Sequence, residues 1–241
     1  MGAGGFYEPK TNQGSAVSCL VDNRFVVSSL TTSANFSSSQ NGYYIMATSY
    51  NEQFTLKPEN PYVMPEILDA PLTEKGRQEA YLLQPRVQSM PNQPDLIVLS
   101  PNCRALQTGV IAFGHLLENN PKVPFIAHEM VREETGVHIC DKRRPTSKQA
   151  KEFPMVDFSL LESEEDNIFM AERRETKMEI GERIYNFMEW LAKRPEKHIG
   201  IASHSGWLMT LFNGMLECDE SLKSWFQTGE MRSVKLLFSQ Q

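Results

Sequence analysis

Long apolar runs, paired cysteines and an excess of positive charge are all missing from this chain of 241 residues. The longest aliphatic run is Leu96–Leu99, whereas a bilayer span needs about 20 apolar residues, so we expect no membrane-spanning segment. Four cysteines without a CxxC pair make no disulfide framework and fit a reducing intracellular compartment. The net charge of −6 excludes the basic surface with which proteins bind nucleic acid.

Residues 1–40 differ in composition from the rest of the chain. They contain eight serines, and only four of their residues are charged. We interpret them as a Ser-rich N-terminal extension that makes few contacts with the remaining domain and docks onto a protein partner. A transit peptide is the alternative, so cytoplasm, mitochondrion and plastid all stay open as locations. Arg24–Val27 is a short strand candidate within the extension.

From residue 41 onward, apolar periodicity predicts alternating strands and helices. The predicted strands cover residues 43–46, 95–100, 123–127, 198–203 and 234–238, and the predicted helices cover 74–84, 105–117, 176–193 and 206–215. This alternation is typical of an α/β fold, in which a central, mostly parallel sheet is covered by helices on both faces.

Polar residues follow three of the predicted strands, and the carboxyl ends of strands are where α/β proteins bind ligands. His204 and Ser205 begin the helix after residues 198–203, next to backbone N–H groups that attract anions. Arg104 lies in the first turn after residues 95–100 and carries a fork suited to phosphate. Glu133 or Glu134, beyond the strand at 123–127, supplies a candidate general acid.

Several motifs resemble those of the histidine phosphatase superfamily, and most closely the phosphoglycerate mutase-like proteins of plants, fungi and protists. The motifs are Leu72–Ala80, Ser100–Thr108, Gly136–Arg144, Phe153–Glu162, Arg174–Thr176 and Ser203–Gly206. The resemblance implies a three-layer phosphoglycerate mutase-like fold over residues 41–241. We expect neither a metal nor another cofactor.

The first strand departs from the family pattern. Members of the family carry Arg-His-Gly or Arg-His-Ala after this strand, and the histidine is the nucleophile that becomes phosphorylated. Here Ala47, Thr48 and Ser49 stand at those positions. A threonine hydroxyl needs a base before it can attack phosphorus, and alanine cannot replace a guanidinium that binds a dianion.

The sequence therefore indicates a degenerate family member without catalytic activity. It would bind a phosphorylated small molecule weakly, or serve as a structural subunit of a larger assembly through residues 1–40. The alternative is an active phosphomonoesterase or mutase-like enzyme that uses His204 and Arg104. On either hypothesis the catalytic positions are His204, Glu133 and Thr48, and the phosphate-binding candidates are Arg104, Ser205, Arg143 and Arg144.

Two further patterns have simpler interpretations. His138 and Cys140 are spaced like metal ligands, but no second pair supports a metal site. The acidic run Glu162–Asp166 is most simply a solvated loop.

Overall fold

The computed structural model describes residues 15–21, 41–47 and 61–240, which include a seven-stranded sheet. The strands are β1 (Ser15–Val21), β2 (Asn41–Ala47), β3 (Leu96–Leu99), β4 (Phe125–Ala127), β5 (His198–Ser203), β6 (Leu216–Glu217) and β7 (Met231–Gln240). The helices are α1 (Glu74–Gln88), α2 (Cys103–Ala112), α3 (Gly114–Asn119), α4 (Thr146–Glu152), α5 (Lys177–Ala192) and α6 (Ser205–Thr210), and α6 continues as a π-helical turn over Leu211–Met215.

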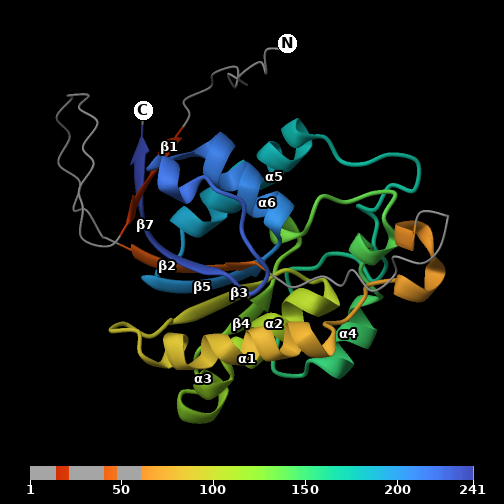
Figure 1. The fold of residues 1–241 in the computed structure, drawn as a ribbon, viewed down its shortest axis with the longest axis horizontal. Coiled ribbons are helices and arrows are strands. Elements are labelled where there is room, and N and C mark those ends of the chain that lie inside the picture. Colours follow the sequence, from red (N-terminus) through yellow and green to blue (C-terminus); the bar gives the residue numbers. More distant parts are fainter. Residues whose placement is uncertain (1–14, 22–40, 48–60, 241) are drawn as a thin grey trace.

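The strand order is β4-β3-β5-β2-β7-β1-β6. β4, β3, β5 and β2 are parallel neighbours, and β7 runs antiparallel to β2. Helices α5 and α6 cover one face of the sheet, and α1, α2 and α3 cover the other (Figure 1). The predicted fold class is therefore confirmed.

β3 shows how the sequence builds this three-layer core. Its side chains alternate between the two faces, as the two-residue period of a strand requires. Leu96 and Val98 belong to the apolar cluster under α5 and α6, whereas Ile97 and Leu99 belong to the cluster under α1 and α2. A strand that is buried on both faces reads as an unbroken apolar run, which is why the sequence signal was clear.

Helix α5 also follows its sequence pattern closely. Thr176 and Glu179 form a capping box, in which each side chain binds the other residue's backbone N–H. All the apolar positions predicted to share one face are buried: Ile180, Ile184, Phe187, Met188 and Leu191.

Other helix boundaries differ from the prediction. The helix expected to end near Pro85 begins at its predicted N-cap, Thr73, but continues to Gln88. Pro85 has no N–H to donate to the Tyr81 carbonyl four residues earlier. Both residues are exposed, so water can satisfy that carbonyl. The helix expected over residues 105–117 is divided at Phe113 into α2 and α3.

Part of the N-terminal extension belongs to the sheet. β1 pairs antiparallel with β7 along its whole length and parallel with β6 over two residues. The expectation that residues 1–40 make few contacts with the domain is therefore wrong for Ser15–Val21. The physical reason is the length of β7, whose outer edge would otherwise present unpaired backbone groups. The strand candidate Arg24–Val27 lies outside the described residues.

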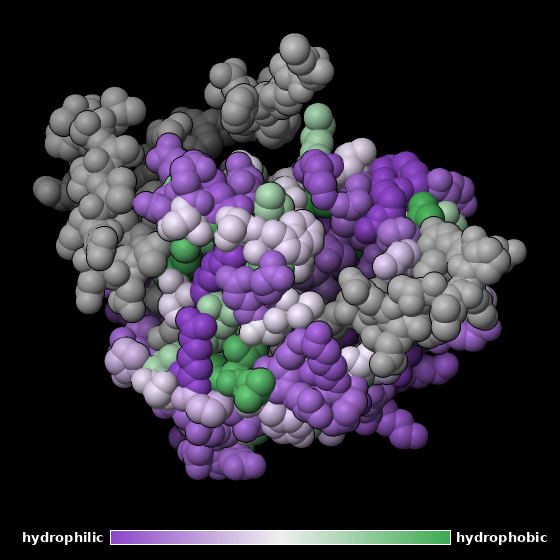
Figure 2. Space-filling model, viewed as in Figure 1, coloured by the Kyte–Doolittle hydropathy of each residue, from purple (hydrophilic) through white to green (hydrophobic). Residues whose placement is uncertain are grey.

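The described surface in the view of Figure 2 is mostly hydrophilic, with a small apolar area over α1. This helix carries exposed Tyr81 and Leu82. Within the described residues, no helix combines the length and apolarity needed to cross a membrane.

Candidate active site

The chain segments that follow β3 and β5 meet at one edge of the sheet. Leu99 is paired with Ala202, and the Ser100 N–H donates to the Ala202 carbonyl at 2.9 Å. His204 Nε2 lies 2.8 Å from Ser100 Oγ. The two strands thus bring the imidazole and the start of α2, which carries Arg104, to the same place.

His204 is buried at the N-cap of α6, with 1% of its surface exposed. Burial lowers the pKa of the imidazole well below its ordinary value, and the positive charges of Arg104, Arg132 and Arg183 lower it further. A neutral imidazole is therefore the stable form at pH 7. In that form one ring nitrogen is a hydrogen-bond donor and the other is an acceptor.

The side chain of Glu133 contacts the first turn of the same helix, α6. Its Oε2 accepts from the Gly206 N–H at 3.4 Å, and its Oε1 accepts from the Glu134 N–H at 2.9 Å. A Cβ at position 206 would lie too close to the Glu133 carboxylate, so a larger residue there would displace this side chain. Burial and the negative charge of Asp141 raise the pKa of Glu133, which favours the protonated acid.

The sequence left two candidates for this acid, and they lie in different surroundings. Glu134 pairs with Lys177 at 2.5 Å and with Arg174 at 3.2 Å. Partial burial opposes ionisation of Glu134, but these two cations lower its pKa on balance. Glu133 is thus the carboxyl beside the start of α6, and Glu134 belongs to an ion-pair group.

Arg183 of α5 holds the segment that carries Glu133. Its guanidinium donates to the carbonyls of Met130 at 2.9 Å, Arg132 at 3.2 Å and Glu133 at 3.2 Å. It also forms an ion pair with Glu175 at 2.7 Å. The position of Glu133 is therefore fixed from the helix layer above the sheet.

Arg104 is buried in the first turn of α2 and binds the segment that follows Gly136. Its NH1 donates to the Cys140 carbonyl at 2.9 Å, and its NH2 donates to Asp141 Oδ1 at 2.8 Å. Asp141 Oδ2 accepts from Arg174 NH1 at 2.8 Å. A single carboxylate thus bridges two guanidinium groups.

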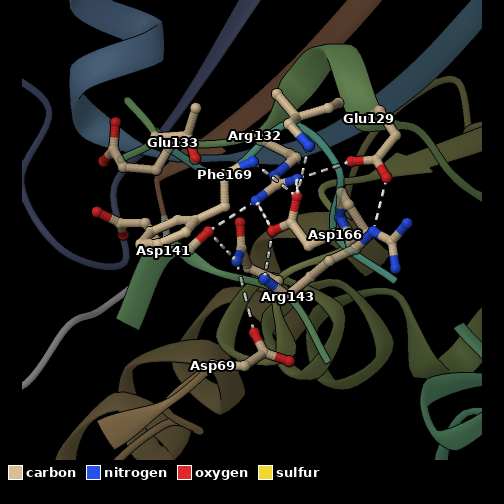
Figure 3. Close-up of polar contacts among 12 residues, drawn as sticks. Asp69, Glu129, Arg132, Glu133, Asp141, Arg143, Asp166 and Phe169 are labelled. Atoms are coloured by element: carbon tan, nitrogen blue, oxygen red, sulfur yellow. Dashed lines mark hydrogen bonds and ion pairs between the residues drawn. The ribbon is translucent and has the colours of Figure 1, made fainter. Parts of the chain in front are cut away.

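A buried ion network lies next to this group (Figure 3). Arg132 donates to both oxygens of Asp166, at 2.8 and 2.6 Å, and to Glu129 at 3.1 Å. Arg143 Nε donates to Glu129 at 2.6 Å. Asp166 is therefore part of a buried pair, and the expectation of a fully solvated acidic run is wrong at this residue.

The structure does not support phosphate binding by Arg143. The guanidinium is buried, and its two terminal nitrogens contact Thr146 and the backbone carbonyls of residues 144 and 163–165. Its N–H groups therefore have protein acceptors within hydrogen-bond distance. The sequence did not reveal this, because the carbonyls of residues 163–165 belong to a loop about twenty residues further along the chain.

Arg144 and Ser205 also have partners within the protein. Arg144 forms ion pairs with Asp69 at 3.1 Å and with Glu152 at 2.9 Å, and Asp69 in turn accepts from the Cys103 N–H at 2.8 Å. The Ser205 hydroxyl donates to the Phe226 carbonyl at 3.2 Å. Roles of these two residues in phosphate binding remain predictions, and their contacts within the protein do not favour them.

His138 and Cys140 do not point to a metal site. The His138 ring stacks on Tyr62 with centroids 4.8 Å apart, and Cys140 is buried against Asp141. In the part of the chain that the structure describes, no three His, Cys, Asp or Glu side chains are arranged to hold a metal ion.

The first-strand position is described only up to Ala47. This residue ends β2, and the parallel register pairs it with Ser203, the residue before His204. Thr48 and Ser49 lie outside the described residues. The backbone register therefore brings the end of β2 to the edge of the sheet where β5 delivers His204.

Sequence reasoning missed Asp141, Asp69 and Arg132 as members of this region. Asp141 belongs to the segment that resembles the family, but within that segment the basic residues Arg143 and Arg144 were the predicted phosphate ligands. Arg104 and Asp141 are 37 positions apart, and Arg132 and Asp166 are 34 apart. Pairs at that separation leave no local periodic signal.

Comparison with known proteins places the chain in a family. The family model described as "Histidine phosphatase superfamily (branch 1)" matches residues 62–241. Phosphoglycerate mutase-like protein 1 of Arabidopsis thaliana is 34% identical over 206 residues, which cover 73% of either chain. A second Arabidopsis thaliana phosphoglycerate mutase-like protein is 32% identical over 193 residues, 69% of this chain and 71% of the relative.

The fold has counterparts among solved structures. The α-ribazole phosphatase of Shigella flexneri superposes with a TM-score of 0.53 and 16% identity, covering 80% of this chain and 89% of that one. At this identity the likeness concerns the fold alone.

Proposed function

Because the chain belongs to the histidine phosphatase superfamily (branch 1) and is phosphoglycerate mutase-like, we propose that it is a degenerate member that binds a phosphorylated small molecule weakly without turning it over. One observation carries this proposal. Ala47, at the end of β2, is in register with Ser203 beside His204, and the sequence there continues with Thr48. An arginine and a nucleophilic histidine are the groups that the family has at these two positions.

The chemical consequence is the loss of the attacking group. A neutral imidazole attacks phosphorus and gives a phosphoramidate that water can cleave, whereas a threonine hydroxyl must first lose a proton to a base. The missing guanidinium removes a charge-assisted contact to the phosphoryl oxygens. Each transition-state contact of this kind contributes about a hundredfold or more to a rate.

An active phosphomonoesterase is the second candidate, and the protonation states favour it. His204 is held neutral and Glu133 is held toward its protonated form, which is how a site prepares a hydrogen-bonding imidazole and a general acid. On this alternative, Arg104 and His204 bind the phosphoryl group, and a water molecule attacks it. Glu133 then protonates the leaving alcohol.

Restoring the missing groups tests the proposal. The double variant Ala47→Arg with Thr48→His should bind inorganic phosphate more tightly than the wild type and release phosphate from a panel of phosphomonoesters. Thr48→His alone should do less, since the dianion still lacks its second arginine. The matched control is Ala47→Gln with Thr48→Asn, which adds side chains of similar size without a cation or an imidazole.

The outcomes separate the two candidates. Gain of phosphate release in the double variant, but not in the control, supports the degenerate member. Wild-type release that is already fast, and that His204→Ala abolishes, supports the active phosphomonoesterase.

A further inference from the structure

The carboxylate of Asp141 lies between two guanidinium groups. Its Oδ1 accepts from Arg104 NH2 and its Oδ2 accepts from Arg174 NH1, both at 2.8 Å. Arginines also bind a phosphoryl group in this geometry, in which two oxygens of one anion lie between two guanidinium groups. A ligand that approaches Arg104 therefore meets an acceptor that is already in place.

Hydrogen bonds to the backbone carbonyl hold Asp141 in place, and its side chain makes the contacts with the two arginines. The Asp141 carbonyl accepts from Asn102 Nδ2 at 3.1 Å and from Arg132 NH2 at 2.8 Å. The side chain itself is 5% exposed, whereas that of Arg174 is 28% exposed. Solvent therefore reaches the bridge from the Arg174 side.

The segment that leads to Asp141 carries backbone strain. Val137 has φ 59°, a left-handed conformation that β-branched residues rarely adopt, and the His138 N–H donates to the Gly136 carbonyl at 2.6 Å across it. Gly136 has φ 95°, and a Cβ there would collide with the Arg173 carbonyl. Strain of this kind persists only where surrounding contacts enforce it, and it is concentrated at ligand sites and switches.

We propose that Asp141 is an internal competitor that closes the Arg104–Arg174 anion site, and that a phosphorylated ligand must displace its carboxylate from both guanidinium groups before it binds. This inference rests on the proposed function, because it takes Arg104 as a phosphate-binding residue. It gives the proposed weak binding a cause that is separate from the residues at positions 47 and 48. Exchange of one anion for another keeps both arginines paired.

The test compares the affinity for inorganic phosphate between the wild type and Asp141→Asn, by calorimetric titration at constant ionic strength. Asparagine keeps the shape and can still accept one hydrogen bond, but it no longer competes as an anion. A hydrogen bond to a charged group corresponds to a factor of about ten or more in affinity, so Kd should fall by about that factor.

Glu134→Gln is the matched control. It removes the same charge from a nearby residue that also contacts Arg174, but the contacts of Glu134 are with Arg174 and Lys177 rather than with Arg104. Its effect should stay within about fivefold, the range for partly exposed ion pairs. Equal gains in the two variants would show a general charge effect and overturn the inference.

The remaining outcomes show whether the competitor role of Asp141 or the proposed phosphate binding itself has failed. Phosphate binding by the wild type that Asp141→Asn leaves unchanged or weakens overturns the competitor role and leaves the binding function standing. No phosphate binding by either protein removes both.

A second measurement on the wild type covers the case in which Asp141→Asn does not fold. A crystal structure at saturating phosphate should show the anion on Arg104 and Arg174, with the Asp141 carboxylate withdrawn from both. Phosphate bound while both Asp141 contacts persist would overturn the inference, and so would crystals without phosphate at this site.

Discussion

Two groups of titratable side chains lie side by side in this molecule, and their surroundings favour opposite charge states. In the ion network, Arg132 and Asp166 meet at 2.6 Å, and although burial opposes ionisation, this partner holds the pKa of Asp166 below its usual range. In the candidate site, burial moves His204 and Glu133 toward their neutral forms. The paired charges of the ion network stabilise the fold. Titratable groups with pKa values shifted toward the neutral form, as in the candidate site, are typical of functional sites.

The loss that the proposed function requires concerns a different strand end. His204, which β5 delivers, and Glu133, on the segment after β4, have protein partners and shifted pKa values. β2 ends at Ala47, and Thr48 follows it in the sequence; neither residue offers a guanidinium or an imidazole. On the proposed function, the change at this one strand end removes the nucleophile, whereas His204, Arg104 and Glu133 are all present.

The largest expected effect is on stability, in the ion network. Asp166→Asn leaves the buried Arg132 guanidinium without its bidentate partner, and breaking a buried pair costs about 3–5 kcal/mol. The free energy of unfolding from urea denaturation measures this loss. A cost close to that of an exposed polar substitution would show that the network does not hold the loop in place.

The pH dependence of stability should have opposite signs in the two groups. Asp166 has a pKa below its ordinary value of 3.8, so it contributes stability that is present above pH 3.8 and is lost as the pH falls through the lower folded-state value. The difference in unfolding free energy between wild type and Asp166→Asn should therefore shrink in acid. A constant difference across this range would contradict the ion-pair account.

Glu133 should behave in the reverse way. Its pKa lies above the ordinary 4.5, so its favourable contribution is complete below pH 4.5 and is lost as the pH rises through the folded-state value. Glu133→Gln should therefore become more stable relative to wild type as the pH increases from acid toward neutral. Parallel stability profiles for the two proteins would show that Glu133 is not held toward its protonated form.

The smallest expected effect belongs to an exposed ion pair, which sharpens the contrast with Arg132. Arg173 binds Glu179 at 2.6 Å with half of its side chain exposed. Solvent screening removes most of the benefit of such a pair. Arg173→Gln should leave the urea midpoint within experimental error, and a loss comparable to that of Asp166→Asn would contradict the distinction by burial.

The sequence predicted most of the fold because the signals were local. The unbroken apolar run of β3 and the spacing on α5 fixed their types, and β5 has the predicted bounds, His198–Ser203. The extent of α1 beyond Pro85 and the incorporation of β1 were not predictable in the same way. They depend on solvent access at one carbonyl and on the free edge of a distant strand.

Less of the candidate site was predictable. Arg104, His204 and the carboxyl at 133 or 134 follow strands, so the rule for strand ends identified them. The choice of Glu133 over Glu134, and the roles of Asp141 and Arg143, depend on contacts between segments far apart in the chain. Pairwise electrostatics of that kind leaves no trace in periodicity or composition.

The most direct test of the central claim is the rate at which the purified wild-type protein releases phosphate from a panel of phosphomonoesters, compared with His204→Ala. The account predicts the same background rate for both proteins, with no phosphohistidine detectable by mass spectrometry. A wild-type turnover of about 10 per second, the median for enzymes, that is lost in His204→Ala would contradict it.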